Sequence, residues 1–213
     1  MYSTVSQSQL HRIASWLLGV ASLLSATLAF SQQEFAPSSV HKGALLVASP
    51  SLADPNFTQT VLLIVEHGQG GTLGLVLNRP TDVLLAEVLQ DLPMLKQTDH
   101  RLFGGGPVGR TQLVLLFRLG RILPDVRHIV DKVYLGTPIV LEHVMASPKP
   151  NEAFRGFAGF AGWAPGQLEY EMHQGSWGVL SSHAFDIFSK DPRTLWPDSI
   201  GLLQAPRTIS NER

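Results

Sequence analysis

Short apolar runs separated by turn residues set the strongest limit on how this chain can fold. From Gly43 onward, runs rich in Val, Leu and Ile alternate with clusters of Gly, Pro, Asn and Asp. This spacing is typical of a β-rich domain, whereas a helical bundle needs longer periodic segments. The 213 residues include 19 glycines and 14 prolines, which fits a fold with many turns. The predicted strands are residues 44–49, 60–67, 72–78, 111–119 and 128–135.

Two of these strands are apolar on both faces, and a later segment adds an unusual glycine pattern. Residues 61–65 and 113–117 carry apolar side chains at successive positions, which predicts strands buried on both sides. Residues 67–71 read as a hairpin turn, because consecutive glycines supply positive φ angles. Residues 154–163 place a glycine at every third position among aromatics. We interpret this run as a bent core strand, with a partner-binding edge as the alternative.

Capping residues predict a smaller number of helices. Thr81 is the expected N-cap of a helix over residues 82–92, which Pro93 ends. Further helices are expected over residues 165–173, over residues 184–189, and from Asp191 or Asp198 to Gln204. Strands and helices mixed without a regular β-α-β alternation predict a single α+β domain.

The N-terminus predicts export. Residues 13–30 are eighteen residues without a charge, and Arg12 precedes them. Small side chains at Ala29 and Ser31 fit signal-peptide cleavage after Ser31. A retained membrane anchor, with membrane contact only through residues 13–30, and a misassigned start codon are the alternatives. The expected divisions are a signal peptide or anchor (1–31), a linker (32–42), the folded domain (43–205) and a tail (206–213).

Composition excludes several classes of function. Lys and Arg number 16 against 17 Asp and Glu, and only 15% of residues are charged, so we expect no direct nucleic-acid binding. The absence of cysteine excludes disulfides, thiolate metal sites and a cysteine nucleophile.

Five sequence blocks together resemble one family. They are LVASPSLADPNF (46–57), VEH (65–67) leading to GLVLNRP (74–80), GGPV (105–108), GWAPGQLE (162–169) and Trp177. In this order the blocks are similar to the YqgE/AlgH family over about residues 43–203. The resemblance implies an α+β fold with a strongly bent, mixed or antiparallel sheet and flanking helices. It implies no established biochemical activity, and the family label of transcriptional regulator comes from one branch. The motif residues with an expected structural role are Pro50, Phe57, Trp163, Gly166, Gln167, Glu169 and Trp177.

The chain departs from the family pattern in two places. The family continues after GGPV with a charged segment ending in a histidine, whereas residues 109–117 here read GRTQLVLLF. The family is also usually intracellular and starts near the equivalent of Gly43, so the hydrophobic leader is an addition.

The strand ends around Asn78 and Arg79 supply the best candidate site. Arg79 precedes the helix predicted over residues 82–92, whose N-terminus would favour an anion. The alternative is that Arg79 pairs with Glu66 or Asp54 and that Asn78 shapes the turn. Asp54 is expected to bind backbone N–H groups of its own loop, with Phe57 in the core. The candidate binding surface comprises Asp54, Glu66, Asn78, Arg79, Gly105, Gly106 and Pro107.

The remaining motifs give no catalytic, metal or cofactor site. Residues 104–109 formally match the dinucleotide fingerprint G-x-G-x-x-G, but a predicted strand follows where a helix is required. The loop is therefore a tight turn, or alternatively an anion-binding nest. The pairs Glu169 with His173 and His183 with Asp186 are too small for a zinc site, and no nucleophile elbow occurs.

The function expected from the sequence is an exported, non-catalytic binding or interaction module, whose partner is a protein or a small molecule. The alternatives are a cytoplasmic regulator acting through protein contacts and a hydrolase without a recognised motif. No cofactor is expected.

Overall fold

The computed structural model describes residue 35 and residues 39–205. The predicted signal peptide or anchor (1–31), the predicted tail (206–213) and most of the predicted linker (32–42) lie outside the described residues. Within the described ranges, none of the helices has the length and apolar character needed to cross a membrane.

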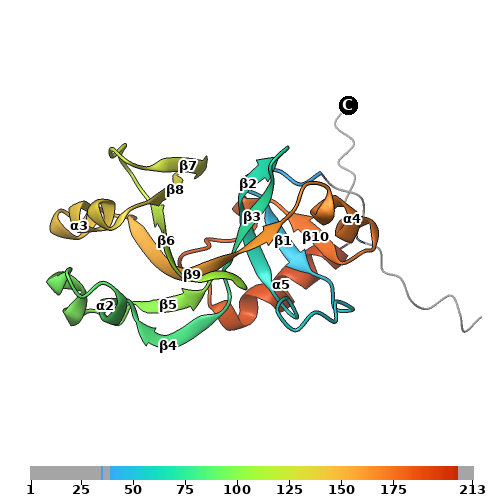
Figure 1. Ribbon diagram of the computed structural model, residues 1–213, viewed down its shortest axis with the longest axis horizontal. Coiled ribbons are helices and arrows are strands. Elements are labelled where there is room, and N and C mark those ends of the chain that lie inside the picture. Colours follow the sequence, from blue (N-terminus) through green and yellow to red (C-terminus); the bar gives the residue numbers. More distant parts are fainter. Residues whose placement is uncertain (1–34, 36–38, 206–213) are drawn as a thin grey trace, which may run out of the picture. The chain divides into compact units, whose positions relative to one another are not determined.

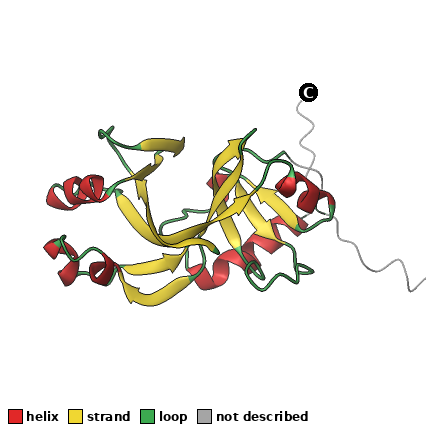
Figure 2. Ribbon diagram, in the orientation of Figure 1, coloured by secondary structure: helices red, strands yellow, loops and turns green. Residues whose placement is uncertain are grey.

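The described residues form a single α+β domain built on a curled, ten-stranded sheet (Figures 1 and 2). Its main path runs β10-β1-β2-β3-β9-β6-β8-β7, β5 also pairs with β9, and β4 pairs with β5. All neighbours are antiparallel except β5 and β9, so the sheet is mixed, as predicted. The strands are β1 (Leu45–Ala48), β2 (Val61–Gly68), β3 (Gly71–Val76), β4 (Pro80–Leu84), β5 (Arg101–Gly104), β6 (Val108–Arg118), β7 (Arg127–Val130), β8 (Val133–Gly136), β9 (Ala153–Trp163) and β10 (Trp177–Leu180).

Strand β9 bends the sheet, which confirms the bent core strand predicted over residues 154–163. Residues 156–158 pair with both β5 and β6, whereas residues 161–163 pair with β3. Gly159 lies between these stretches at φ 73°, a conformation that glycine adopts without strain. A Cβ at Gly159 would also lie 2.5 Å from the Val108 carbonyl oxygen. The glycine therefore lets one strand take part in both halves of the sheet.

The helical segments lie at the ends and faces of this sheet (Figure 2). They are α2 (Leu85–Val88), the 3-10 helix η1 (Pro93–Gln97), α3 (Pro138–Ala146), α4 (Gln167–His173), the 3-10 helix η2 (Ser182–Ala184) and α5 (Pro192–Gln204). Leu195 of α5 packs with Leu45 and Val47 of β1, whereas Leu168 of α4 packs with Leu46 and Ala48. Because strand side chains alternate between faces, α4 and α5 cover opposite faces of β1.

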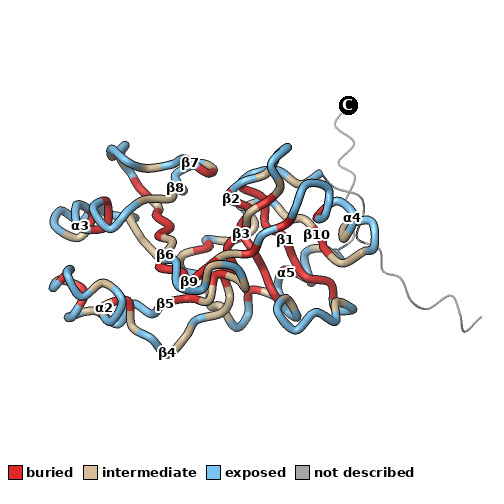
Figure 3. Tube along the Cα trace, viewed as in Figure 1, coloured by how far each residue is buried: buried red, intermediate tan, exposed pale blue. Residues whose placement is uncertain are grey.

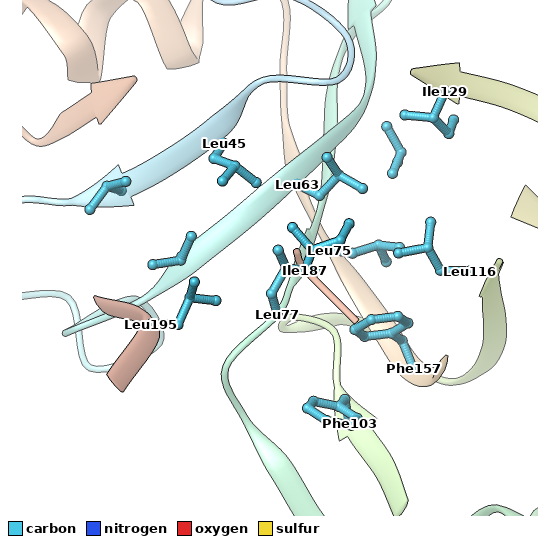
Figure 4. Close-up of a cluster of buried hydrophobic side chains, with 13 residues drawn as sticks. Leu45, Leu63, Leu75, Leu77, Phe103, Leu116, Ile129, Phe157, Ile187 and Leu195 are labelled. Atoms are coloured by element: carbon cyan, nitrogen blue, oxygen red, sulfur yellow. The ribbon is translucent and has the colours of Figure 1, made fainter. Parts of the chain in front are cut away.

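Burial is concentrated along β1, β2 and β3 (Figure 3). The core side chains of one cluster converge from β1, β2, β3, β6 and β9 (Figure 4). All of residues 61–65 are buried, and they alternate between this cluster and a second one on the α4 side. In residues 113–117, Leu116 faces the first cluster, whereas Leu115 and Phe117 face a third one with α3. Both segments therefore pack against apolar clusters on both faces, as the sequence predicted.

The predicted helix over residues 82–92 is wrong. Residues 80–84 form β4, which pairs with β5, and only Leu85–Val88 are α-helical. The Thr81 hydroxyl donates to the Leu102 carbonyl oxygen at 2.8 Å, so Thr81 joins two strands and is not the N-cap of a helix. Tertiary pairing with β5 outweighs the helical spacing of the apolar residues.

Two other predictions need correction. Residues 128–135 form the hairpin of β7 and β8, with Asp131 in the turn at φ 48°, instead of one strand. Residues 184–189 are not a helix, because η2 ends at Ala184 and turns follow. Helix α3 and strands β5 and β10 were not predicted. Helix α5 confirms the C-terminal helix, and its N-cap is Asp191, whose side chain accepts from Arg193 N.

Candidate functional site

We use the name strand-end cluster for Asn78, Arg79 and residues 105–107, which the structure brings together. The Asn78 side chain accepts from Val61 N at 3.0 Å and donates to the Gln59 carbonyl oxygen at 2.9 Å. Gly104 N donates to the Arg79 carbonyl oxygen, and Val76 N donates to that of Gly105. These contacts tie the end of β3 to β2 and to the loop after β5, so Asn78 shapes the local backbone.

The Arg79 side chain binds the loop before β2. Its Nη2 donates to the Thr58 carbonyl oxygen at 3.2 Å and to Thr60 Oγ1 at 3.0 Å. Desolvation by burial lowers the pKa of Arg79, and the nearby charge of Asp54 opposes this shift. Arg79 therefore lies near Asp54 but holds the loop through a carbonyl and a hydroxyl.

The glycines of the strand-end cluster are packed against β9. A Cβ at Gly105 would lie 2.1 Å from the Gly159 carbonyl oxygen, and one at Gly106 would lie 2.2 Å from the Phe160 carbonyl carbon. Gly105 N already donates to the Ala158 carbonyl oxygen at 2.9 Å. This geometry supports the interpretation as a tight turn with close backbone packing.

Glu66 does not join the strand-end cluster. It lies five residues along β2 from Val61, or about 16 Å at the rise of an extended strand. Its carboxylate binds the Arg127 guanidinium at 2.8 Å, which connects β2 to β7. Asp54 accepts from Asn56 N at 2.8 Å, which confirms the expectation that Asp54 binds backbone N–H groups of its own loop.

The motif residues around α4 form an aromatic cluster closed by a carboxylate. Phe57 stacks on Trp163 with ring centroids 5.8 Å apart, and Trp177 meets both rings edge-on. Glu171 Oε2 accepts from the indole N–H groups of Trp163 (3.0 Å) and Trp177 (2.8 Å). The indole donors are satisfied within the fold, which supports a structural role.

The other motif residues have local roles. The Gln167 side chain accepts from Ala164 N at 3.0 Å, and Gly166 at φ 78° is the N-cap of α4, so both fix the helix start. Glu169 instead lies 3.8 Å from His67 Nε2 on β2. Pro50 lies in the turn after β1.

A cavity of about 760 Å³ lies elsewhere, where β4, β5, α3, β9 and the segment before α5 meet. We call it the Arg155 cavity. Its walls come from segments far apart in the sequence, and they are Pro80, Leu85, Asp99, His100, Arg101, Phe103, Val144, Met145, Pro148, Lys149, Glu152, Ala153, Phe154, Arg155, Gly156, Phe188, Ser189, Lys190, Asp191 and Pro192. Ligand pockets in proteins have volumes of roughly 300–1,000 Å³, so this cavity can hold a small molecule.

Arg155 is a half-buried cation in the wall of this cavity. Its Nη1 donates to the Leu77 carbonyl oxygen at 3.3 Å and its Nη2 to that of Phe188 at 2.9 Å. The guanidinium carbon lies 4.7 Å from the centre of the Phe103 ring. Desolvation by burial lowers the pKa of Arg155, and the charge of Asp186 opposes the shift. In the described part of the chain, no carboxylate pairs directly with this guanidinium.

The other charges around the Arg155 cavity are mostly paired. Arg101 binds Asp82 at 3.4 Å, Lys190 binds Asp198, Glu152 binds Arg121 at 3.2 Å, and Asp191 binds Arg193 at 2.9 Å. Among the described lining residues, this leaves Arg155 and Lys149 as cations outside ion pairs and Asp99 as the remaining acid. The cavity therefore has an excess of positive charge.

Aromatic side chains form much of the remaining wall. The His100 ring lies against Phe154 with centroids 4.3 Å apart. Desolvation by burial lowers the pKa of His100, against the effect of the neighbouring Asp99 charge. Because the shift is downward from 6.5, His100 is mainly neutral at pH 7 and contributes an aromatic surface.

An ion pair on the sheet holds the segment before α5 in place. Asp186 binds Arg118 at 2.6 Å and accepts from Phe188 N at 3.0 Å. Desolvation alone would raise the pKa of Asp186, but hydrogen bonds from Arg118, Ser189 and Phe188 N lower it to about 2. The Phe188 carbonyl oxygen, which accepts from Arg155, is positioned by this network.

Sequence reasoning assigned residues 154–163 to a core strand and gave Arg155 no role. One signal was present, since Arg155 is the single charged residue between Glu152 and Glu169. A charge inside a buried strand is costly unless something compensates it, so it marks a position worth testing. Between residues 39 and 205, no group of three or more His, Asp or Glu residues is placed to hold a metal ion.

Comparisons with known proteins agree on one family. The model of the AlgH-like family matches residues 45–207. A UPF0301 protein from Streptomyces avermitilis is 40% identical over 163 residues, covering 72% of this chain and 82% of the relative. A UPF0301 protein from Magnetococcus marinus is 35% identical over 160 residues, covering 74% of this chain and 86% of the relative.

Solved structures share the fold. The solution structure of the AlgH protein from Pseudomonas aeruginosa has a TM-score of 0.64 and 29% identity, covering 80% of this chain and 93% of that chain. The crystal structure of protein DIP2367 from Corynebacterium diphtheriae also has a TM-score of 0.64, at 24% identity, and covers 83% of this chain and all of that one. At that identity, the second likeness concerns the fold alone.

Proposed function

The chain belongs to the AlgH-like family, and from that premise we propose that it is a non-catalytic binding protein whose ligand occupies the Arg155 cavity. The observation that carries the proposal is the cavity itself, about 760 Å³ and lined by three phenylalanines and one histidine among its polar groups. Small-molecule sites are concave, mostly apolar and equipped with a few polar groups, and this description fits the cavity. The strand-end cluster fits it less well, because its side chains and glycines are used in packing.

A thermal-shift screen of small molecules tests this proposal. A ligand that binds only the folded state at 100 times its Kd adds about 2.7 kcal/mol to the free energy of unfolding, which raises the thermal midpoint. Hits should then be measured against two variants of α3. Met145→Trp places a bulky indole ring at a lining position, where it fills part of the cavity. Ala146→Trp adds the same ring at the neighbouring exposed position, outside the lining.

We expect Met145→Trp to lower the affinity for hits at least tenfold and Ala146→Trp to leave it within about twofold. Equal affinity of a hit for both variants and the unmodified protein would contradict the proposal and place the binding site elsewhere. The two alternative functions, a regulator and a hydrolase, would give different experimental results. Retention on DNA that salt removes would favour a regulator, and turnover of ester, peptide or phosphate substrates would favour a hydrolase.

We also propose that residues 1–31 direct export, on the strength of the uncharged run over residues 13–30. N-terminal sequencing and intact mass of the protein from fractionated cells of its source test this. A start near Gln32 in the exported fraction supports cleavage. A chain recovered from the cytoplasm would contradict export and favour the intracellular alternative.

A further inference from the structure

Arg155 indicates the chemistry of the ligand. Burying a guanidinium costs free energy that a fold normally recovers through a carboxylate partner. Here the Arg155 guanidinium donates to two neutral carbonyl groups, and the nearby carboxylate of Asp186 binds Arg118 instead. The positive charge of Arg155 is therefore incompletely neutralised at the cavity wall.

The guanidinium also has N–H groups available to bind a ligand. Of its five N–H groups, the described part of the chain provides acceptors for two. Its two carbonyl partners, Leu77 O after β3 and Phe188 O before α5, fix the group from two sides. An arginine fixed in this way can bind an oxyanion through two parallel hydrogen bonds without further loss of side-chain entropy.

The surroundings favour a ligand with an apolar body. Phe103, Phe154 and Phe188 line the same cavity as Arg155, together with the ring of His100. Two of the three acids in the lining are neutralised, Glu152 by Arg121 and Asp191 by Arg193. An aromatic or aliphatic body can thus pack on the rings while its charged end reaches Arg155.

We infer that the ligand of the Arg155 cavity is a small organic oxyanion, a carboxylate or a phosphate ester, whose anionic group binds the Arg155 guanidinium and whose apolar body packs on Phe154 and Phe188. This inference rests on the proposed binding function and specifies the ligand class for that cavity. It also makes Arg155 the residue that selects for charge.

Three probes of similar shape test the inference on the full chain: benzoate, phenyl phosphate and benzamide, with affinities from isothermal titration or NMR titration. Benzamide keeps the ring and removes the charge. We expect at least one of the two anions to bind at least tenfold more tightly than benzamide, and the preferred anion distinguishes a carboxylate from a phosphate ligand.

Two arginine variants then test whether Arg155 is the residue that binds the anionic group of the probe. Arg155→Met should weaken binding of the preferred anion at least tenfold. Arg127→Gln should leave it within twofold, because Arg127 lies outside the lining of this cavity and is paired with Glu66. If Arg155→Met does not fold, Arg155→Lys and the comparison of probes on the unmodified protein remain decisive.

The outcomes separate this inference from the proposed function. Equal binding of benzamide and the anions, or unchanged anion binding by Arg155→Met, would overturn the oxyanion inference and leave a cavity that binds ligands. Failure of all three probes, together with screening hits that Met145→Trp blocks, would do the same. Failure of the probes and of the screen would overturn both.

Discussion

Arg79 and Arg155 are both partly buried arginines with a pKa lowered by desolvation, but they serve different parts of the molecule. Arg79 holds the loop before β2 within the strand-end cluster, next to glycines that touch β9 directly. Arg155 donates to two carbonyls and borders a cavity of about 760 Å³. Local sequence favours Arg79 as a site, whereas three-dimensional context favours Arg155. The comparison teaches that open space beside a charge, more than the charge itself, distinguishes a site from a packing contact.

The largest expected effect concerns packing in the strand-end cluster. Gly105→Ala should lower the free energy of unfolding by about 3 kcal/mol or more, because the added methyl group would meet the Gly159 carbonyl oxygen at 2.1 Å. Chemical denaturation measures the loss. Gly120→Ala is the matched control, since nothing lies within 4 Å of the position of its Cβ. Unchanged stability of Gly105→Ala would contradict the close packing of this loop and favour the alternative of an anion-binding nest.

The second prediction compares the two arginines directly. Arg79→Ala should cost about 1–2 kcal/mol of stability, because the buried Thr60 hydroxyl and the Thr58 carbonyl lose a charged donor. Binding of the preferred anion should stay within twofold. An unchanged thermal midpoint combined with abolished binding would break the comparison and make the strand-end cluster the site.

The smallest expected effect concerns the support of the Arg155 cavity. The pKa of Asp186, about 2 in the folded protein, lies below the unfolded value of 3.8, so its charge stabilises the fold above about pH 4. This contribution is lost as the pH falls from about 4 towards 2. Asp186→Asn should therefore cost about 1 kcal/mol at pH 7, a value reduced for solvent screening of a partly exposed carboxylate, and almost nothing near pH 2.

Unfolding curves of the unmodified protein and Asp186→Asn across this pH range provide the measurement. Asp91→Asn is the control, because this exposed carboxylate makes no hydrogen bond in the described part of the chain. A cost of Asp186→Asn that stays constant from pH 7 to pH 2 would show that the ion pair with Arg118 does not hold the segment before α5.

The sequence predicted the sheet better than the helices. Residues 61–65 are apolar without interruption, and such a run has few alternatives to a strand buried on both faces. Residues 82–92 carried a helical spacing that β4 overrides, because pairing with β5 is a long-range contact that no local pattern records. The same holds for β5 itself, whose partner in parallel pairing, β9, lies about fifty residues later.

The candidate site was predictable only in part. The role of Asn78 and the close packing of Gly105 follow from local geometry, and the structure supports both interpretations. Placing Glu66 beside Arg79 failed because the two residues lie towards opposite ends of paired strands, a relation that depends on register. The Arg155 cavity could not be predicted, because its walls come from segments between Pro80 and Pro192 that only the fold brings together.

Chemical-shift mapping of the full chain with the tightest-binding of the three probes is the most direct test of the cavity as the binding site. We expect the backbone amide signals of residues 153–156 and 188–191 to move in a saturable manner, while those of residues 105–106 and of the loop that Arg79 binds (58–60) stay in place. Shifts centred on residues 105–106 and 58–60 would contradict the assignment and make the strand-end cluster the binding surface.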